Sequence, residues 1–317
     1  MGFKPLVSIV IPVYNGANYL KEAIDSALIQ TYDNIEVLVI NDGSDDNGET
    51  EEIALSYGNE ILYIYKDNGG VSTALNTGIT EMSGEYFSWL SHDDVYTPEK
   101  IETQINHLCK LENKHDVIFS GWIVIDSVGH EVNRILPLEQ YEKQDLELPL
   151  FPLLNGMISS CSLLVHKSHF ERVGNFNENL PTTQDYDLWF RLMRGQHCRV
   201  SEGALHKTRV HNLQGSRVCR KVHAKESSAL WIKMMNALTE SEMIQLGGSV
   251  PEFYKQIYIL LLKYTNSKFA MRYARRRAVT KRGILGFFQY INLSAFSVLA
   301  VGRLVLSLKR RHSWKFR

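Results

Sequence analysis

Residues 6–16 read Leu6-Val7-Ser8-Ile9-Val10-Ile11-Pro12-Val13-Tyr14-Asn15-Gly16, a largely apolar, β-branched run that ends in a polar turn. An almost continuous apolar run of this length is typical of a strand that is buried on both faces of a sheet. Apolar residues then recur at helical spacing from Leu20 to Leu28, and residues 35–40 form a second apolar run. This order of strand, helix and strand predicts a unit with two parallel strands.

The same pattern repeats further along the chain. Residues 61–65 form a third apolar run, residues 71–82 carry a helical stripe, and residues 86–90 form a fourth run. The repetition predicts an α/β fold with a Rossmann-like, mainly parallel mixed sheet flanked by helices. We expect residues 117–122 and 162–165 to be strands of the same sheet or of its extension. Residues 182–192 predict a short helix that Gly195 can end.

Polar residues directly follow several of the predicted strands. They are Tyr14 and Asn15, the run Asp42-Gly43-Ser44, and the pair Asp93-Asp94. In an open α/β sheet, ligands bind outside the carboxyl ends of the strands, so these side chains should converge on one rim. Each group taken singly also has a simpler interpretation as turn chemistry. Asp93-Asp94 can be a metal or ligand site, or a solvated loop before a helix that Thr97 caps and Pro98 begins.

Two further residues are ambiguous from the sequence alone. Asp185 lies near the start of the helix predicted over residues 182–192, where a carboxylate routinely caps the helix. His211 lies in Arg209-Val210-His211-Asn212 and can be an ordinary surface or core histidine.

Composition excludes several classes of protein. The chain has 317 residues and is 44% hydrophobic, which excludes a largely disordered protein. Its four cysteines are widely spaced and form no C-x-x-C pair, so neither a zinc knuckle nor a dithiol redox site is indicated. We expect free thiols in a reducing cytosol. Because no long apolar segment precedes the first strand, we expect the catalytic part to be cytoplasmic.

The net charge of zero hides a separation of charge along the chain. Residues 253–317 hold fifteen Lys or Arg and no Asp or Glu, so residues 1–252 hold the other twenty cations and all thirty-five anions. Residues 284–302 carry no charged side chain and have basic flanks on both sides. This segment is compatible with peripheral binding to an anionic membrane surface, which we favour, with a buried helical extension or oligomer contact, or with a membrane span.

Taken together, the motifs resemble the family 2 glycosyltransferases over roughly residues 5–217. The resemblance is carried by Val7-Ser8-Ile9-Val10-Ile11-Pro12-Val13-Tyr14-Asn15, Val39-Ile40-Asn41-Asp42-Gly43-Ser44-Asp45-Asp46, Asn76-Thr77-Gly78-Ile79, Gly84-Glu85-Tyr86, Asp93-Asp94, Gly174-Asn175-Phe176-Asn177-Glu178 and Asp185-Tyr186-Asp187-Leu188-Trp189. It implies a GT-A fold over residues 1–225, with a nucleotide-sugar-binding half (1–100) and an acceptor and catalytic half (101–225). A basic helical extension is expected over residues 226–317.

The resemblance also implies roles for individual residues. Pro12, Tyr14 and Asp42 match segments that surround the nucleoside, with Asp42 accepting a hydrogen bond from uracil, and Asn76 matches a further donor-binding position. Asp93 and Asp94 match carboxylates that hold a divalent cation, Mn²⁺ or Mg²⁺, and the ribose of the donor. His211 matches a metal or diphosphate ligand. Asp185 matches the general base.

Three positions depart from the family pattern. Ser91 stands where many members have the first acid of the metal loop, which leaves the division of roles between Asp93 and Asp94 open and makes His92 a possible polar neighbour. Gln184 replaces a common Glu beside Asp185, and Leu75 replaces an Arg that often contacts the diphosphate.

The implied activity is inverting transfer from a nucleotide sugar, usually a UDP-sugar, to a hydroxyl of a glycan or lipid-linked acceptor in cell-surface polysaccharide synthesis. We expect the enzyme to be cytoplasmic and peripheral at the inner face of the cell membrane, and we expect no nucleic-acid partner. A nucleotidyltransferase and a non-catalytic nucleotide-sugar-binding protein are the alternatives. The first is disfavoured because no Gly-rich basic loop for a triphosphate is apparent.

Overall fold

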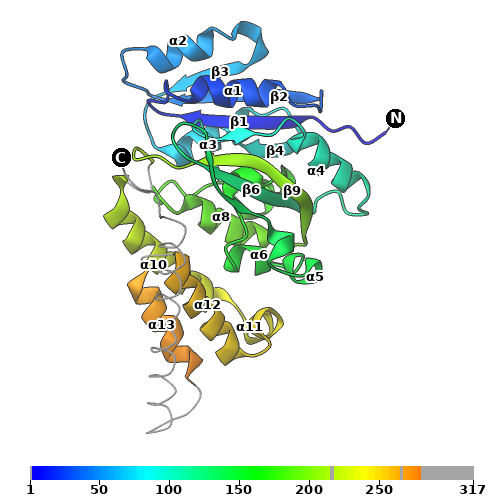
Figure 1. Cartoon of the computed structure of the whole chain (residues 1–317), viewed down its shortest axis with the longest axis vertical. Coiled ribbons are helices and arrows are strands. Elements are labelled where there is room, and N and C mark those ends of the chain that lie inside the picture. The colour runs from blue at the N-terminus through cyan, green and yellow to red at the C-terminus, as the bar shows by residue number, and fades with distance from the viewer. Residues whose placement is uncertain (1, 215–217, 265–266, 280–317) are drawn as a thin grey trace. The chain divides into compact units, whose positions relative to one another are not determined.

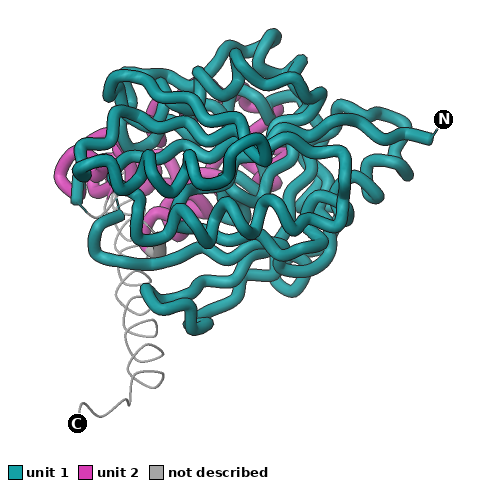
Figure 2. The backbone as a smooth tube through the Cα atoms, turned by 90° about the horizontal axis from the view of Figure 1, so that it is seen from above, with its two compact units in different colours: residues 1–219 teal, residues 220–317 magenta. Residues whose placement is uncertain are grey.

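A computed structural model describes residues 2–214, 218–264 and 267–279 of the chain. The chain divides into two compact units, residues 1–219 and residues 220–317, which Figure 2 shows in different colours.

The first unit is built on a five-stranded sheet (Figure 1). Its strands are β1 (Val7–Val13), β2 (Ile35–Asp42), β3 (Leu62–Lys66), β4 (Tyr86–Trp89) and β8 (Val165–His166), in the order β3-β2-β1-β4-β8. All neighbours pair in parallel except β4 and β8. The predicted strand-helix alternation is confirmed over this region, because the apolar runs form β1 to β4 and the helical stripes form α1 (Leu20–Leu28) and α3 (Val71–Glu81).

The strand order determines where a ligand can bind. The connections from β1 to β2 and from β2 to β3 move in one direction, through α1 and α2 (Glu49–Leu55), whereas the connection from β3 through α3 to β4 returns past β1. Because such crossovers are right-handed, α1 and α2 cover one face of the sheet and α3 covers the other. The reversal opens a crevice between the carboxyl ends of β1 and β4.

A second sheet completes this unit, in the order β5-β9-β6-β7. Its strands are β5 (Val95–Tyr96), β6 (Val117–Ile125), β7 (Glu131–Ile135) and β9 (Cys198–Arg209). The prediction that residues 117–122 belong to the first sheet or to its extension is therefore wrong, although an isolated bridge between Ile118 and Leu164 links β6 to the edge of the first sheet. The physical reason is that β8 has two residues, whereas β9 offers β6 a long partner.

Shorter elements complete the first unit. They are η1 (Gly58–Glu60), α4 (Lys100–Cys109), η2 (Pro137–Glu139), α5 (Lys143–Leu146), α6 (Phe151–Leu154), η3 (Ser160–Ser162), α7 (Ser168–Val173) and α8 (Gln184–Met193). The expected helix start at Pro98 is wrong: α4 begins at Lys100, and the Thr97 hydroxyl donates to the Leu205 carbonyl at 3.2 Å rather than capping α4. Helix α8 ends just before Gly195, which has a φ of +71°.

The second unit is helical, as the sequence predicts. It contains α10 (Arg220–Ala237), α11 (Glu240–Gly247), α12 (Val250–Tyr264) and α13 (Lys268–Ala278). The side chains of Trp231, Met234 and Phe253 are buried in it. Within the described ranges, no helix combines the length and the apolar character that crossing a bilayer requires. Residues 284–302, to which the membrane prediction applies, lie outside those ranges.

Candidate functional site

A cavity of about 600 Å³ opens at the carboxyl ends of β1 and β4. Its lining comes from the ends of β1, β2 and β4 with the loops after β1 and β4, from α3, and from residues 158–161. The start of α8 with the residues just before it, and the end of β9 with the residues that follow it, complete the lining. This volume lies in the range of small-molecule sites, and the place is the one that the strand order predicts. Of the predicted site residues, Pro12, Tyr14, Asp42, Asp93, Asp94, Asp185 and His211 all line this cavity.

Asp93 and His211 meet at the cavity wall. The Asp93 Oδ2 atom lies 2.8 Å from His211 Nε2, and the ring of Tyr19 packs against His211 at 5.2 Å between ring centroids. A carboxylate and an imidazole in contact can ligate one divalent ion together. Among the described residues, however, no group of three His, Cys, Asp or Glu side chains is placed to hold a metal by itself.

Asp94 has a different environment from its neighbour. One carboxylate oxygen accepts the Arg209 backbone N–H at 2.8 Å, and the other accepts from the Cys161 thiol at 3.3 Å. Burial raises the pKa of Asp94 well above its usual value, and the charge of Asp93 acts in the same direction. The Asp94 side chain thus joins three segments of the cavity wall through protein contacts.

Arg209 holds the loop after β4 in place. Its side chain is buried, and its Nε donates to the Asp93 carbonyl at 2.9 Å. The guanidinium also pairs with Glu22 and lies over the Tyr19 ring, 4.4 Å from the centroid. This role of Arg209 could not be predicted from the sequence, where its one signal is a position two residues before His211.

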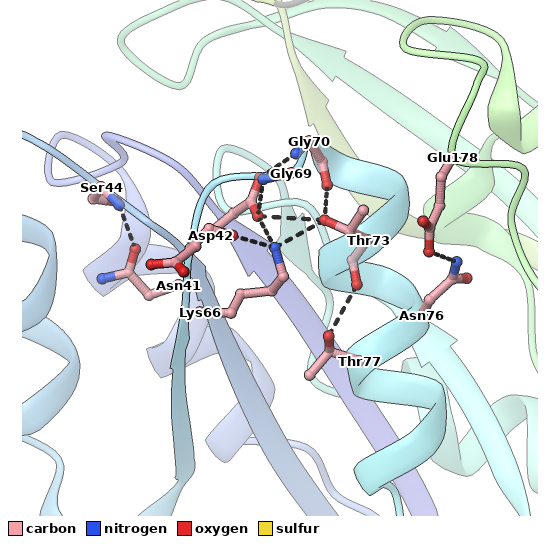
Figure 3. A network of polar contacts seen from close by, with 11 residues as sticks. Asn41, Asp42, Ser44, Lys66, Gly69, Gly70, Thr73, Asn76, Thr77 and Glu178 are labelled. Atoms are coloured by element: carbon pink, nitrogen blue, oxygen red, sulfur yellow. Dashed lines mark hydrogen bonds and ion pairs between the residues drawn. The ribbon is translucent and has the colours of Figure 1, made fainter.

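Asp42 lies in a network of donors at the end of β2 (Figure 3). Its Oδ1 accepts from Lys66 Nζ at 2.6 Å and from the Gly69 N–H at 3.0 Å, and its Oδ2 accepts from the Gly70 N–H at 2.7 Å. The Thr73 hydroxyl lies 3.4 Å from Oδ1. Since a carboxylate oxygen accepts two hydrogen bonds, Oδ2 retains acceptor capacity for a ligand.

Tyr14 and Asn15, which follow β1, also line the cavity. The Asn15 amide donates to Asp45 at 2.6 Å, and the Tyr14 hydroxyl donates to the same oxygen at 3.2 Å. These bonds lower the pKa of Asp45. Tyr14 remains 44% exposed, so its ring is open to a ligand.

Asp185 lies in the first turn of α8. Its Oδ2 accepts from the Ser160 hydroxyl at 2.9 Å, and its Oδ1 accepts from the Tyr186 N–H at 2.8 Å. Ser160 in turn accepts from Trp189 Nε1 at 3.1 Å. These contacts orient the Asp185 carboxylate at the cavity wall. The role of Ser160 could not be predicted from the sequence.

Asn76 does not line the cavity. Its amide nitrogen donates to the Phe176 carbonyl at 3.0 Å and to Glu178 at 2.9 Å, and its amide oxygen accepts the Phe176 N–H at 2.9 Å. Figure 3 shows the bond from Asn76 on α3 to Glu178. For Asn76 to contact the donor as predicted, its amide would have to break hydrogen bonds to Phe176 or Glu178 and form new ones to the donor.

Acidic side chains outnumber basic ones in the cavity lining. Among the described lining residues there are four Asp, two His and no Lys or Arg. Burial lowers the pKa of His92, which favours its neutral form. An anionic diphosphate bound in this part of the site would therefore need a cation to balance its charge.

Comparison with known proteins decides the family. The sequence profile described as "Glycosyl transferase family 2" matches residues 8–174. The chain belongs to this family. An uncharacterized glycosyltransferase from Rickettsia felis is 54% identical over 245 residues, which cover 77% of this chain and 40% of that protein. The chain thus spans about 40% of the length of that relative.

Solved structures share the GT-A fold with this chain. A mannosyltransferase from Pyrobaculum calidifontis, in complex with GDP-Man and Mn²⁺, matches this chain with a TM-score of 0.58 at 17% identity. The match covers 98% of this chain and 83% of the mannosyltransferase chain. S. aureus TarS in complex with UDP-GlcNAc matches this chain with a TM-score of 0.55 at 17% identity. The match covers 93% of this chain and 81% of the TarS chain. At this level of identity the likeness concerns the fold.

Proposed function

We propose that this chain is an inverting glycosyltransferase that moves a sugar from a nucleotide-sugar donor, in the first instance a UDP-sugar, to a hydroxyl group of a glycan or lipid-linked acceptor. The proposal rests on one observation: Asp93, His211 and Asp185 line the same cavity, at the switch point of the GT-A sheet. The family and the donors bound by the two solved structures support the same reading.

A divalent cation, Mn²⁺ or Mg²⁺, fits this site. Asp93 and His211 would hold it, because their ligand atoms lie 2.8 Å apart at the cavity wall. When bound, such an ion balances the charge of a diphosphate leaving group, which the described lining cannot do without Lys or Arg. Both carboxylate oxygens of Asp94 accept hydrogen bonds, from the Arg209 N–H and from the Cys161 thiol. We therefore assign Asp94 to positioning the loop that carries Asp93.

Asp185 is the proposed general base. Its carboxylate would accept the proton of the acceptor hydroxyl during attack, a contribution of roughly 10²- to 10⁴-fold in rate. Ser160 and the Tyr186 N–H hold both oxygens in place, which keeps the base oriented before the acceptor binds. A single base and direct displacement invert the configuration at the anomeric carbon.

Pro12, Tyr14 and Asp42 are the proposed nucleoside contacts. All three line the cavity at the ends of β1 and β2. The free acceptor capacity of Asp42 Oδ2 suits an N–H group of a nucleobase.

The second unit supplies the proposed contact with a membrane. We assign residues 1–225 to the catalytic domain and residues 226–317 to a basic extension that binds the inner face of an anionic membrane. On α13, Arg272 and Arg276 are exposed, and Phe269 is 70% exposed. Their spacing puts an aromatic ring and two cations along one helical stripe, which suits an anionic lipid surface. We extend the proposal to a role in cell-surface polysaccharide synthesis, which the family resemblance implies.

A donor screen tests the activity without knowledge of the acceptor. The full-length chain would be incubated with UDP- and GDP-sugars, with Mn²⁺ or EDTA, and the released nucleotide identified. We expect metal-dependent release of nucleoside diphosphate from one donor. A parallel incubation with nucleoside triphosphates and sugar phosphates tests the alternative, because release of pyrophosphate there would assign a nucleotidyltransferase.

A further inference from the structure

Turn η3 contacts both halves of the proposed site. The hydroxyl of Ser160 donates to Asp185 Oδ2 at 2.9 Å, and the thiol of the next residue, Cys161, donates to Asp94 Oδ2 at 3.3 Å. Both Ser160 and Cys161 line the cavity, and Cys161 is only 2% exposed. Two neighbouring side chains of one turn thus hold the proposed base and the loop that carries the proposed metal ligand Asp93.

Cys161 contacts both ends of the tight turn that contains Asp93. This turn runs from Ser91 to Asp94, and the Asp94 N–H closes it by donating to the Ser91 carbonyl at 3.1 Å. At the first residue, the Ser91 N–H donates to Cys161 Sγ at 3.4 Å, and at the last residue Asp94 accepts the thiol proton. A thiol donates one hydrogen bond and can also accept, so the two bonds are compatible. The Cys161 thiol therefore bridges the two ends of this turn.

Polar contacts inside the protein fix turn η3 itself. The Gln104 amide, on α4, donates to the Ser162 carbonyl at 2.7 Å, and the Ser162 hydroxyl donates to the Ser159 carbonyl at 2.6 Å. The Ser159 hydroxyl lies 2.9 Å from Nε2 of His206, on β9. The side chains of Gln104, Ser162 and His206 are fully buried. Because α4 and β9 both hold the turn, its side chains have few alternative positions.

A fixed turn at this place matters for the proposed chemistry. In direct displacement, the base must reach the acceptor hydroxyl while the metal holds the diphosphate of the same donor, so the two groups need a fixed separation. Asp93 follows β4 and Asp185 lies at the start of α8, so their separation depends on contacts between distant segments. Turn η3 supplies such contacts to both segments. A shift of the turn of Asp93 would lower the rate even with the donor bound.

We propose that Cys161 is a positioning residue of this enzyme: its thiol holds the turn of Asp93, and turn η3 thereby sets the metal site against the general base. This inference rests on the proposed glycosyltransferase function, because it assumes a donor diphosphate on the metal and Asp185 as the base.

Variants of the full-length chain separate these contacts. Cys161→Ala removes the thiol, and Cys161→Val removes it while filling the space. Cys161→Ser restores a donor and an acceptor on a shorter side chain, and Ser160→Ala removes the hydroxyl that holds the base. Cys198→Ala is the matched control, because Cys198 is fully buried on β9 and lies outside the cavity lining.

Three measurements are made on each protein. Calorimetric titration with UDP or GDP at graded Mn²⁺ gives the metal dependence of nucleotide binding. Release of nucleoside diphosphate from a UDP- or GDP-sugar, at saturating Mn²⁺ and donor, gives turnover. Urea unfolding gives stability.

We expect Cys161→Ala to raise the Mn²⁺ concentration for half-maximal nucleotide binding by about 3- to 10-fold, because Asp94 loses a buried hydrogen-bond donor. Turnover at saturating Mn²⁺ and donor should fall by about 5- to 50-fold. Cys161→Ser should recover most of both losses. Ser160→Ala should lower turnover with the Mn²⁺ dependence unchanged. Cys198→Ala should be destabilised and keep both properties of the wild type.

Two results would overturn the inference and leave the proposed function standing. The first is turnover and Mn²⁺ dependence of Cys161→Ala within about twofold of the wild type. The second is equal losses in Cys161→Ser and Cys161→Ala, which would assign the thiol to packing alone. If Cys161→Ala does not fold, the same criteria apply to Cys161→Val. If wild-type protein bound no nucleotide at all, the proposed function would fail, and this inference with it.

Discussion

The Asp93 carboxylate lies 2.8 Å from the His211 imidazole, although 118 positions separate the two residues. Asp93 comes from the loop after β4, and His211 from the chain just beyond β9, so the pair exists only when the two sheets are assembled. Arg209 secures the arrangement, since its backbone N–H binds Asp94 and its side chain binds the Asp93 carbonyl. Residues 209–211 thus contain both Arg209, which holds the loop after β4 in place, and His211, a proposed metal ligand.

Removing either member of this pair should weaken metal-dependent donor binding. We expect His211→Ala to raise the Mn²⁺ concentration needed for half-maximal nucleotide binding by about 10- to 100-fold, because one of two protein ligands is lost. Asp93→Ala should have at least as large an effect. Calorimetric titration of the nucleotide at graded Mn²⁺ measures this, with Asp33→Asn as a remote acidic control. Unchanged Mn²⁺ dependence in both variants would exclude the proposed ligand pair.

Asn76 provides a test that separates structure from donor binding. Its amide joins α3 to residues 176–178 through three hydrogen bonds. We expect Asn76→Ala to lower the free energy of unfolding by about 1–3 kcal/mol, because bonded groups are left unpaired. Nucleotide affinity should stay within about twofold. Urea unfolding and nucleotide titration on the same preparation check this, and a selective loss of nucleotide affinity would restore the donor-binding prediction from the family resemblance.

The first sheet could be predicted from the sequence because its strands β1, β2 and β4 are largely buried on both faces. Residues 7–13 and 35–42 read as near-continuous apolar runs for that reason, and the carboxyl-end rule then brings Asp42 and Asp93 to one cavity. The family resemblance, rather than the residue pattern, singled out Asp185 and His211 among many similar residues.

Contacts between distant segments could not be predicted in the same way. The burial of Arg209 depends on Glu22, 187 positions away, and local sequence predicts an exposed arginine at such a position. The hydroxyl of Ser160 reaches Asp185 only because the turn η3 lies beside α8. The sheet to which β6 belongs was predicted wrongly, since its pairing depends on the length of β9, which is not visible from residues 117–122 themselves.

Lys100 should make stability depend on pH. It is fully buried, and its ammonium donates to Ser88 and Gln104, each at 2.9 Å. The other titratable groups around it are the Tyr96 ring, 4.2 Å away, with Cys161 and His206. Burial lowers the pKa of Lys100 from 10.5 to about 7. Between these values the unfolded chain binds a proton that the folded chain does not, so the contribution of Lys100 to stability rises with pH.

The variant Lys100→Met isolates this contribution. From pH 7 to pH 9 the wild type should gain about 2 kcal/mol in the free energy of unfolding relative to the variant, since one pKa unit corresponds to about 1.4 kcal/mol. Urea unfolding of both proteins at the two pH values measures the difference. Parallel changes in the two proteins would show that Lys100 is charged in the folded state.

The basic stripe on α13 should govern membrane binding. Reversing two charges with Arg272→Glu and Arg276→Glu should reduce co-sedimentation with phosphatidylglycerol vesicles by at least about tenfold, because each cation near such a surface contributes roughly 1 kcal/mol. The same change of charge at Lys110 and Lys225 serves as the control. Phosphatidylcholine vesicles should bind neither protein. Equal pelleting of the stripe variant and the wild type on anionic lipid would remove this part of the proposal.

The role of Asp185 is the centre of the proposed chemistry, and Asp185→Asn tests it most directly. The substitution keeps the size of the side chain and a hydrogen-bond acceptor for Ser160, but removes the base. Single-turnover transfer, or metal-dependent donor hydrolysis, should be compared with nucleotide-sugar affinity in the same variant. We expect turnover to fall by about 10²-fold or more while affinity stays within about threefold. Undiminished turnover with normal affinity would contradict the assignment of Asp185 as the general base.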